Sequence, residues 1–310
     1  MKIVFMGTPD FAVGALDALC KAGHEIVAVV TQPDKPKGRS DKLLFSPVKE
    51  YAVKAGIPVL QPVRIKRPES VAELKNYPAD VFVVAAFGQI LSKEILDMPK
   101  YGCLNIHASL LPKYRGSSPI QWAVINGEEK SGVTIQQMNE GVDTGDILYQ
   151  KEMMLDAKET GESLFDKLAV LGAEAIVETL SLLEQGRLVP VPQDEALATH
   201  TVMLDKTMGR MDFSKSAAEL ERLVRGLNSW PSAYTFFEGK QLKVWEADVV
   251  EDGNADGADG EIVAVGKDSF DVKCAQGSLR IRSLQLEGKK RMSTHDFLLG
   301  NAVKKGMHLG

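Results

Sequence analysis

The apolar run DVFVVAAFG at residues 80–88 constrains the fold of this chain more than any other stretch. Its residues from Val81 to Phe87 show no alternation of polar and apolar positions, which is typical of a strand buried on both faces. Such a strand needs a covering layer on each side, as in an open parallel sheet with helices on both faces. The rest of the sequence should therefore supply alternating strands and helices.

The first 31 residues have this pattern. KIVFM at 2–6 predicts a strand, residues 11–21 have helical spacing, and EIVAVVT at 25–31 predicts a second strand. This order is typical of the first half of a doubly wound α/β fold. Thr8 and Pro9 follow Gly7 where a GxGxxG fingerprint would continue, so a nicotinamide or flavin dinucleotide is not indicated.

Further elements extend this predicted domain to residue 186. The pattern predicts helices over 47–55, 118–126 and 160–185, and a strand that ends in LNIH at 104–107. Residues 132–138 and 145–154 alternate like two antiparallel neighbours. We therefore expect residues 1–186 to form a doubly wound, mostly parallel, Rossmann-like α/β domain.

The remaining residues predict a linker and a smaller domain. Residues 187–206 contain Pro190 and Pro192 and few periodic apolar positions, as an extended linker would. Residues 207–310 contain one predicted helix, at 216–227, and five short strands, at 233–238, 241–249, 260–265, 269–274 and 278–286. Five short strands with mostly short connections favour a small β-barrel of the oligonucleotide-binding type.

Composition is that of a globular chain of two domains, with 44% hydrophobic and 25% charged residues among 310. Three distant cysteines without a CxxC pair disfavour disulfides and thiolate metal sites, so we expect a reducing cytoplasm. MKIVFM is interrupted at Gly7, too early for a signal peptide, and no apolar run approaches membrane-spanning length. We therefore expect neither secretion nor membrane insertion.

Charge is uneven along the chain, although its net value is only −5. Residues 280–310 hold seven basic and two acidic side chains, a net charge of +5. The long loop at 32–47 carries Lys35, Lys37, Arg39 and Lys42 at the expected carboxyl edge of the sheet, where ligands bind. Both regions suit a polyanionic partner, and both are also compatible with a solvated basic surface.

Asn105, His107 and Asp143 form the candidate chemical site. Side chains alternate across a strand, so Asn105 and His107 should share one face while Ile106 occupies the other. Asp143 lies in GVDTG, where two glycines permit a tight loop close to the adjacent strand. An amide, an acid/base group and a carboxylate are thus expected at the ligand-binding edge of the sheet.

This set lacks a nucleophile, and GxSxG, GxxxxGK[ST] and HExxH are absent from the sequence, which weakens the cases for a serine hydrolase, a nucleotide hydrolase and a zinc peptidase. The set suits direct transfer of an acyl-like group, in which Asn105 or His107 donates to an oxyanion and Asp143 relays a proton. A structural NxH pair without catalytic role is the alternative.

Several segments in both domains follow a recognisable pattern. They are GTPDF (7–11), QPDKPKGR (32–39), FGQIL (87–91), NIHASLLPKYRG (105–116), PIQWAVINGE (119–128), GVTIQQMNEGVDTGDIL (132–148), QDEALATH (193–200), GRMDF (209–213), RGLNSWPSAY (225–234) and LKVWEA (242–247). These segments closely resemble the methionyl-tRNA formyltransferase family. The resemblance implies formyl transfer from 10-formyltetrahydrofolate to the α-amino group of methionine on initiator tRNA, with a tRNA-binding carboxyl domain.

The resemblance also implies site residues. Asn105, His107 and Asp143 would perform the chemistry, and Phe11 would lie near the aminoacyl group. Folate would contact two segments: Phe87, Gly88, Gln89, Ile90 and Leu91, and Ser109, Leu110, Leu111 and Pro112. The acceptor end of the tRNA would meet Lys35, Lys37, Arg39 and Lys42. No metal is implied, and a monomer is expected.

Departures from the family pattern are minor. The family often has Tyr at position 87, Pro at 92 and Ala at 117 and 118, where this chain has Phe87, Ser92, Ser117 and Ser118. They bear on the pterin contacts. Formyltransferases that act on glycinamide ribonucleotide or amino sugars share the same three catalytic residues, and a non-catalytic RNA-binding module is an alternative of another class. The basic second domain favours a tRNA substrate over glycinamide ribonucleotide or amino sugars.

Overall fold

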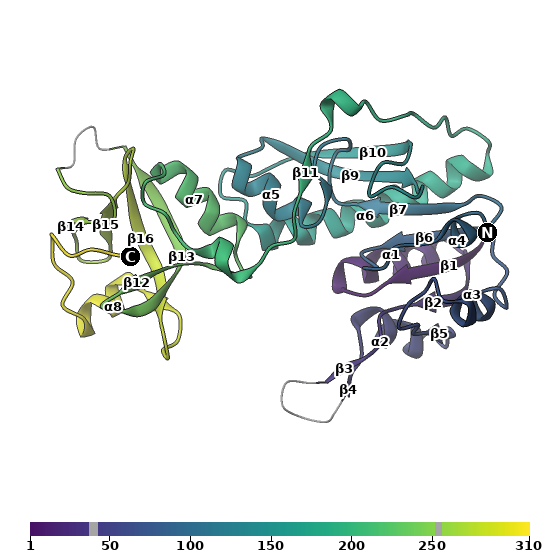
Figure 1. Ribbon diagram of the computed structural model, residues 1–310, viewed down its shortest axis with the longest axis horizontal. Helices are drawn as coiled ribbons and strands as arrows, with labels where there is room; N and C mark the ends of the chain where they lie inside the picture. The colour runs from purple at the N-terminus through teal and green to yellow at the C-terminus, as the bar shows by residue number, and fades with distance from the viewer. Residues whose placement is uncertain (37–42, 252–255) are drawn as a thin grey trace. The chain divides into compact units, whose positions relative to one another are not determined.

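The computed structural model describes residues 1–36, 43–251 and 256–310. Contacts divide the chain into two units: one comprises 1–119, 130–154 and 165–201, and the other 120–129, 155–164 and 202–310 (Figure 1). These units are interleaved along the chain. The division predicted from the sequence, with boundaries at 186 and 206, follows chain order and stays a prediction.

The first unit is built on a seven-stranded mixed sheet. Its strands, in spatial order, are β10 (Ile147–Met154), β9 (Lys130–Gln137), β7 (Cys103–His107), β6 (Val81–Ala85), β1 (Lys2–Gly7), β2 (Glu25–Val30) and β5 (Val59–Leu60). The strands from β7 to β5 are parallel, whereas β9 is antiparallel to both β7 and β10. The predicted α/β class with a mostly parallel sheet is confirmed.

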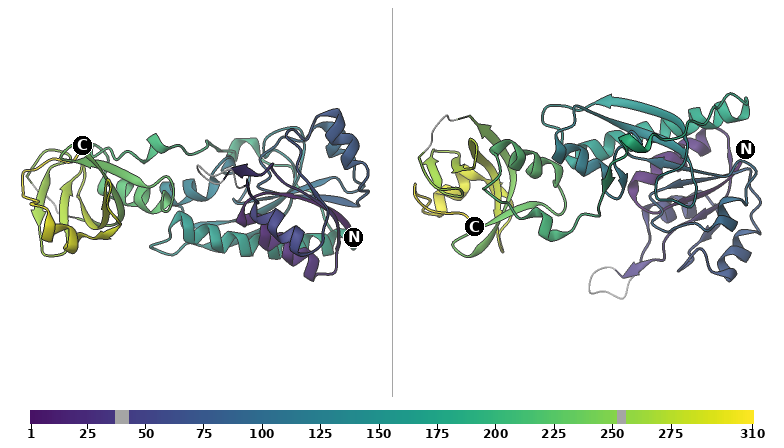
Figure 2. Two further views of the ribbon diagram at one scale, coloured as in Figure 1. Left: turned by 90° about the horizontal axis from the view of Figure 1, so that it is seen from below. Right: turned by 45° about the horizontal axis from the view of Figure 1, so that its top comes forward.

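Helices cover both faces of this sheet (Figure 2). They are α1 (Asp10–Lys21), α2 (Pro47–Lys54), α3 (Pro68–Leu74), α4 (Lys93–Leu96) and most of α6 (Gly161–Glu184). Every residue of β6 is buried, as its continuous apolar run predicts. Gly172 lets α6 approach β7 closely, since a Cβ there would lie 2.9 Å from Ile106 Cγ2. Cys103, two positions from Asn105 on β7, packs instead with Ile95 of α4.

Strand order reverses between β1 and β6, which makes their carboxyl ends a topological switch point. The turn after β1 begins at Gly7, where a Cβ would lie 2.9 Å from the carbonyl oxygen of Ala85 at the end of β6. A side chain at position 7 would therefore force these two strand ends apart. The segment at 86–91 follows β6 directly, and β7 is the next strand of the sheet.

Short elements complete the first unit. They are β3 (Lys35–Pro36), β4 (Leu43–Leu44), β8 (Arg115–Gly116), the 3₁₀ helix η1 (Glu195–Leu197) and β11 (His200–Thr201). β3 pairs with β4, and β11 pairs in parallel with β8. The sequence predicts an extended linker at 187–206, but its residues 193–201 form η1 and β11 and hydrogen-bond within the first unit.

The second unit is built on an antiparallel sheet of strand order β12 (Ala233–Phe237), β13 (Lys240–Val250), β16 (Ser278–Leu286), β15 (Phe270–Lys273) and β14 (Ile262–Val265), with β17 (Met292–Ser293) on β16. The strands from β12 to β16 match the five predicted ones, whereas β17 was not predicted. The unit also contains most of α5 (Pro119–Asn126), η2 (Lys206–Gly209), α7 (Ala217–Gly226) and α8 (Thr294–Gly300). The side chains of Ser216 and Glu219 form a capping box at the start of α7.

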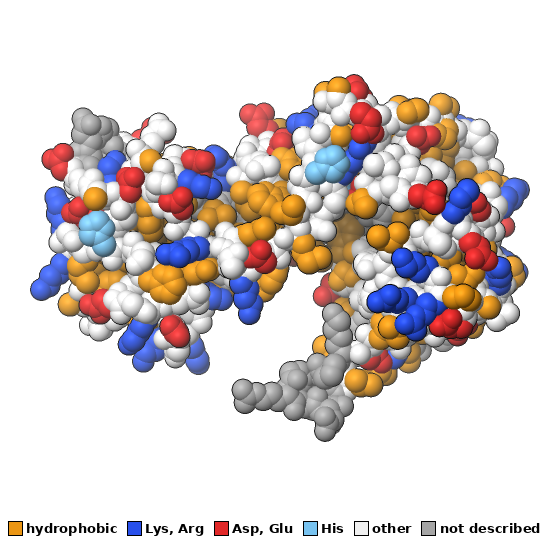
Figure 3. Space-filling view, viewed as in Figure 1, with side chains coloured by type: hydrophobic (Ala, Val, Ile, Leu, Met, Phe, Trp, Pro, Cys, Tyr) orange, Lys and Arg blue, Asp and Glu red, His pale blue; other side chains and the backbone are white. Residues whose placement is uncertain are grey.

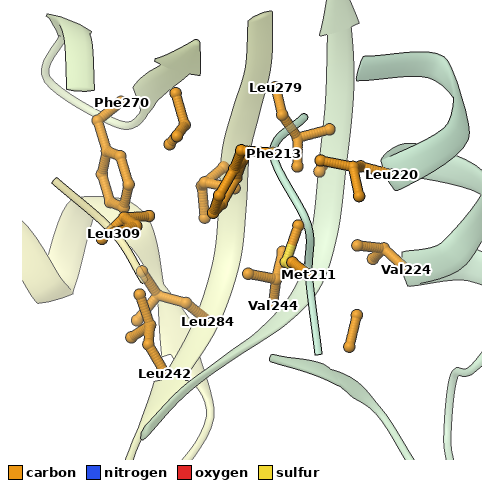
Figure 4. Close-up of a cluster of buried hydrophobic side chains, with 14 of the residues drawn as sticks. Met211, Phe213, Leu220, Val224, Leu242, Val244, Phe270, Leu279, Leu284 and Leu309 are labelled. Atoms are coloured by element: carbon orange, nitrogen blue, oxygen red, sulfur yellow. The ribbon is translucent and has the colours of Figure 1, made fainter. Parts of the chain in front are cut away.

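The strands of this second sheet and the adjacent α7 enclose an apolar core (Figure 4). Residues at alternate positions point inward, for example Leu242 and Val244 on β13 and Leu284 and Leu286 on β16. The side chains of Leu220 and Val224, four residues apart on α7, join them. The period of the apolar positions in the sequence therefore suffices to place this core.

The segment 306–310 closes the second sheet. The amide of Ile262 donates to the carbonyl of Met307, and the amide of Leu309 donates to that of Gly260, at the β14 side. The amide of Gly310 donates to the carbonyl of Phe236 on β12. The two outer strands are thus joined through this segment, which agrees with the predicted barrel.

Candidate active site

Asn105 and His107 lie at the carboxyl end of β7 and share one face, as the alternation of the strand predicts. Ile106 points to the other face, where it packs against Gly172 of α6. β9 pairs with this strand so that Gln136 is opposite Asn105. An apolar contact on one face thus fixes the orientation of the polar pair on the other.

Asp143 makes four polar contacts that place it beside this pair. Its Oδ2 accepts from the backbone N–H of Gly116 at 2.9 Å, and its Oδ1 accepts from Gln136 Nε2 at 2.8 Å. Asn105 Nδ2 and His107 Nδ1 each lie 3.5 Å from the same Oδ1. The structure therefore brings the three predicted residues together, with Asp143 at the centre.

The loop that carries Asp143 is as tight as its glycines predict. A Cβ at position 145 would lie 1.7 Å from the carbonyl oxygen of Gln137, so only glycine fits there. Asp143 itself has a φ of 53°, in the left-handed region that non-glycine residues seldom adopt. The carboxylate is therefore presented by a strained backbone.

His107 is buried and contacts oxygen atoms through both ring nitrogens. Nε2 lies 2.9 Å from the carbonyl oxygen of Tyr114. Since a carbonyl oxygen only accepts, Nε2 is the donor in this bond. Nδ1 is then the nitrogen that faces Asp143. Its 3.5 Å separation from Oδ1 is longer than an ordinary hydrogen bond, so Nδ1 can serve another oxygen in the same space.

Gln136 is a site residue that the sequence analysis missed. Its side chain is 2% exposed, and its Oε1 has no hydrogen-bond partner among the residues described. Gln136 lies two residues after Thr134 in an alternating strand, so both side chains should point to the same face of the sheet. This alternation is the sequence signal that could have identified Gln136.

Arg115 was also missed. This side chain is 1% exposed, and both terminal nitrogens bind the Glu195 carboxylate, at 2.9 and 2.8 Å. That hydrogen bonding raises the pKa of the Arg115 guanidinium and lowers the pKa of the Glu195 carboxyl from their ordinary values. A basic residue in the run PKYRG gives no signal that it is buried, because its partner lies 80 residues away.

The first predicted folate segment follows β6. Phe87 and Leu91 are buried in the apolar cluster on one face of the sheet, whereas Ile90 is 69% exposed. Gly88 has a φ of 77°, and Gln89 bonds to the backbone of Ile65 and Pro62 through its side chain. Within this segment Gly88 and Ile90 are exposed to solvent and Gln89 is partly exposed.

The second predicted folate segment, Ser109 to Pro112, lies beside β9. Ser109 Oγ donates to the carbonyl of Lys113 at 2.7 Å, and the amide of Leu111 donates to Thr134 Oγ1 at 3.0 Å. Leu110 packs near Gly132, and the peptide before Pro112 is cis. Much of the polar capacity of this segment is therefore used within the protein.

The predicted tRNA-contacting residues are described only in part. Phe11 is 6% exposed and forms an edge-on ring contact with Phe165, 5.6 Å between centroids, so it belongs to the core. The backbone of Lys35 is in β3. Lys37, Arg39 and Lys42 lie outside the described residues.

No cluster of three or more His, Cys, Asp or Glu side chains in 1–36, 43–251 and 256–310 has the arrangement of a metal site. None of the helices there combines the length and hydropathy needed to cross a bilayer.

Comparison with known families matches both parts of the chain. Residues 1–180 match the family model described as formyl transferase. Residues 203–302 match the model described as the formyl transferase C-terminal domain.

Individual proteins extend this likeness over the full length. The chain is 58% identical to the methionyl-tRNA formyltransferase of Lachnospira eligens, covering 100% of both chains. It is 54% identical to that of Agathobacter rectalis, covering 99% of this chain and 98% of the other. The fold is similar to that of an N-formyltransferase from Helicobacter canadensis solved with folinic acid and dTDP-3-aminofucose, with a TM-score of 0.68 at 18% identity over 91% of this chain and 98% of that one.

Proposed function

This chain belongs to the methionyl-tRNA formyltransferase family, and from that premise we propose that it transfers a formyl group from 10-formyltetrahydrofolate to the α-amino group of methionyl-initiator tRNA. The observation that carries the catalytic part of the proposal is the convergence of Asn105, His107 and Asp143 around a single carboxylate oxygen. This convergence lies on the strand next to the switch point, where open α/β sheets bind ligands.

Asn105 is the main donor to the oxyanion that forms when the amine attacks the formyl carbon. One hydrogen of its Nδ2 faces Asp143, and its other amide hydrogen has no partner among the residues that the structure describes. A donor held in place before the reaction contributes about 3 to 4 kcal/mol to such a step. His107 adds a second donor through Nδ1 when the ring is protonated, because Nε2–H is already bonded to the Tyr114 carbonyl.

Asp143 assists the proton transfer. The attacking amine loses a proton as the new C–N bond forms, and the folate nitrogen gains one as its bond to the formyl carbon breaks. A carboxylate beside both donors can accept the first proton and pass one on. The reaction needs no nucleophile from the enzyme, because an aminoacyl amine has an accessible neutral form near pH 7 and can attack the formyl carbon itself.

The formyl group is supplied by the folate co-substrate, which residues 87–91 and 109–112 would hold. The switch-point position of 86–91 and the exposed apolar Ile90 suit a flat aromatic ligand. Gln136 Oε1, a buried acceptor that lacks a partner among the described residues, adds an unused polar group beside Asn105. An exposed apolar side chain and an acceptor that the described residues leave unpaired thus fit a ligand with both ring and amine groups.

The tRNA partner is supported by the second unit. Of the seven basic residues in 280–310, the three arginines are ion-paired, with Asp271, with Asp248 and Asp268, and with Glu246. Lys289, Lys290, Lys304 and Lys305 are exposed and form no ion pair within the described part of the chain. Basic side chains line the lower margin of this unit in Figure 3. Free lysines of this kind bind phosphates without reading sequence.

A substrate panel tests the proposal. The purified protein is incubated with 10-formyltetrahydrofolate and, separately, methionyl-initiator tRNA, charged elongator tRNA and glycinamide ribonucleotide. We expect formylation of the initiator tRNA, with much less product from the other two. Preferential formylation of glycinamide ribonucleotide would assign the chain to small amines, and binding of tRNA without turnover would identify a non-catalytic RNA-binding module.

Sedimentation at working concentration tests the expected monomer, and cell fractionation tests the expected cytoplasmic location.

A further inference from the structure

The segment 193–201 contacts the backbone that carries Asp143, although it is 50 residues away in sequence. Gln193 Nε2 donates to the carbonyl oxygen of Asp143 at 2.9 Å and to that of Gly145 at 2.7 Å. One side-chain amide thus bonds to the carbonyl oxygens of two residues of the loop. Its geometry sets the separation between these two carbonyls.

This contact is placed where the loop is strained. Asp143 has a positive φ, and such a conformation in a non-glycine residue persists only when surrounding bonds hold it. The side chain of Asp143 is bonded to Gly116 and Gln136, whereas its carbonyl is bonded to Gln193. Without Gln193, the carbonyl of Asp143 would lose its side-chain donor, and the backbone could relax away from the positive φ.

Gln193 is itself fixed in one orientation. Its Oε1 accepts from Arg115 Nε at 3.0 Å, so its Nε2 must be the atom that faces the loop carbonyls. Arg115 is held in turn by its two bonds to Glu195. The amide therefore meets the loop with a single hydrogen-bonding pattern.

The same segment also holds residues 114–116, in which Tyr114 bonds to His107 and Gly116 bonds to Asp143. The amide of Tyr114 donates to Thr199 Oγ1 at 2.8 Å, and the amide of Arg115 donates to the carbonyl of Thr199 at 2.9 Å. The Tyr114 carbonyl binds His107, as described above. Gly116 permits this approach, because a Cβ there would lie 2.5 Å from the carbonyl oxygen of Thr201.

We propose that the segment 193–201 is a positioning element of the active site and that Gln193 is its principal positioning residue, acting through the backbone of Asp143. This inference rests on the proposed function, because it assigns to Asp143 the role given above. The new element is the side chain of Gln193, which touches no substrate but determines where the Asp143 carboxylate lies.

Gln193→Met tests the proposal, since methionine keeps the length of the side chain and removes both the donor and the acceptor. We expect kcat to fall by about 10-fold to 100-fold, because small misplacement of a reacting group has effects of that order, while KM for both substrates changes little. Gln185→Met is the matched control. Gln185 is exposed, contacts only Ser181 and Arg187 in the described structure, and its variant should keep wild-type kcat.

Hydrogen exchange of the full-length protein gives an independent readout. The amides of residues 141–146 should exchange faster in Gln193→Met than in wild type and unchanged in Gln185→Met. Unchanged kcat together with unchanged exchange in Gln193→Met would overturn the proposal. A loss of kcat/KM caused entirely by a rise in KM would also overturn it.

Combination with Asp143→Asn separates this inference from the proposed function. If Gln193 acts through Asp143, the double variant should be no slower than Asp143→Asn alone. The same fold-loss in both backgrounds would overturn the positioning role. Wild-type turnover in Asp143→Asn would instead remove Asp143 from the mechanism, which contradicts the proposed function. An inactive Asp143→Asn together with a fully active Gln193→Met would contradict the further inference alone.

Discussion

The Asp143 loop of the first unit is partly exposed, whereas the apolar core of the second unit is buried, and different interactions hold them. The loop depends on hydrogen bonds from Gly116, Gln136 and Gln193 to one strained residue. The core depends on apolar side chains from regular strands and one helix (Figure 4). Damage to the loop should therefore reduce turnover, whereas damage to the core should reduce stability.

The largest effect is expected from Phe270→Ala on β15. Phe270 is fully buried in the core of the second unit, and removal of a buried aromatic ring costs about 3 to 5 kcal/mol. Trp122, Trp230 and Trp245 all belong to this unit, so tryptophan fluorescence during urea unfolding follows its stability. An unchanged unfolding midpoint would contradict the importance of this core.

His107→Ala should give the opposite result. We expect turnover to fall by about 100-fold, equivalent to about 2.7 kcal/mol of activation free energy, because a donor to the oxyanion is lost. The urea midpoint from tryptophan fluorescence should stay at its wild-type value. His295→Ala is the control, since His295 is exposed in the second unit and bonds only to the Lys267 carbonyl in the described structure. Equal turnover in the two variants would exclude His107 from the mechanism.

Gly145→Ala should have an intermediate effect. The new Cβ meets the carbonyl oxygen of Gln137, so the loop must move and Asp143 with it. We expect turnover to fall on the order of 10-fold, since displacement of a reacting group is costly even when the group remains present. Single-turnover kinetics measure the chemical step directly. Gly300→Ala, at a position with no other atom within 4 Å, should behave as wild type. A fully active Gly145→Ala would show that the loop tolerates displacement.

The smallest effect is expected from Gly14→Ala inside α1. A Cβ at this position would have its nearest neighbour, the Ala169 carbonyl oxygen, at 3.8 Å, an ordinary contact. Alanine should stabilise the helix by roughly 0.5 to 1 kcal/mol because glycine loses more backbone freedom on folding. Calorimetry should show a higher transition temperature for the first unit with unchanged turnover. A lower transition temperature would indicate that α1 is packed more tightly than described.

The contrast also explains what could be predicted from the sequence. An apolar run such as 80–88 is recognised because it is unbroken, as expected of a strand buried on both faces, and an alternating strand such as 241–249 is recognised by its period. The Asp143 loop was predictable for a different reason, namely that its two glycines indicate close backbone approach.

The contacts of residues 193–201 could not be predicted in this way. They consist of side-chain amide and hydroxyl groups bonded to the backbone of distant residues, and of the Arg115 guanidinium bonded to the side chains of Gln193 and Glu195. Hydrogen bonds of that kind leave no period in the sequence, so Pro190 and Pro192 favoured a linker. Short helices were missed as well, although α3 begins at Pro68 and α8 follows Ser293, whose side chain caps it.

The segment 306–310 has a practical consequence for handling the protein. It occupies hydrogen-bonding groups of β12 and of the chain beside β14, and it places Leu309 in the core. Removal of residues 306–310 would leave two open strand edges beside exposed apolar surface, which is the template on which sheets associate with one another. A preparation trimmed there should aggregate while its far-ultraviolet spectrum still reports folded protein, so intact mass is the quality measure to record before any stability comparison.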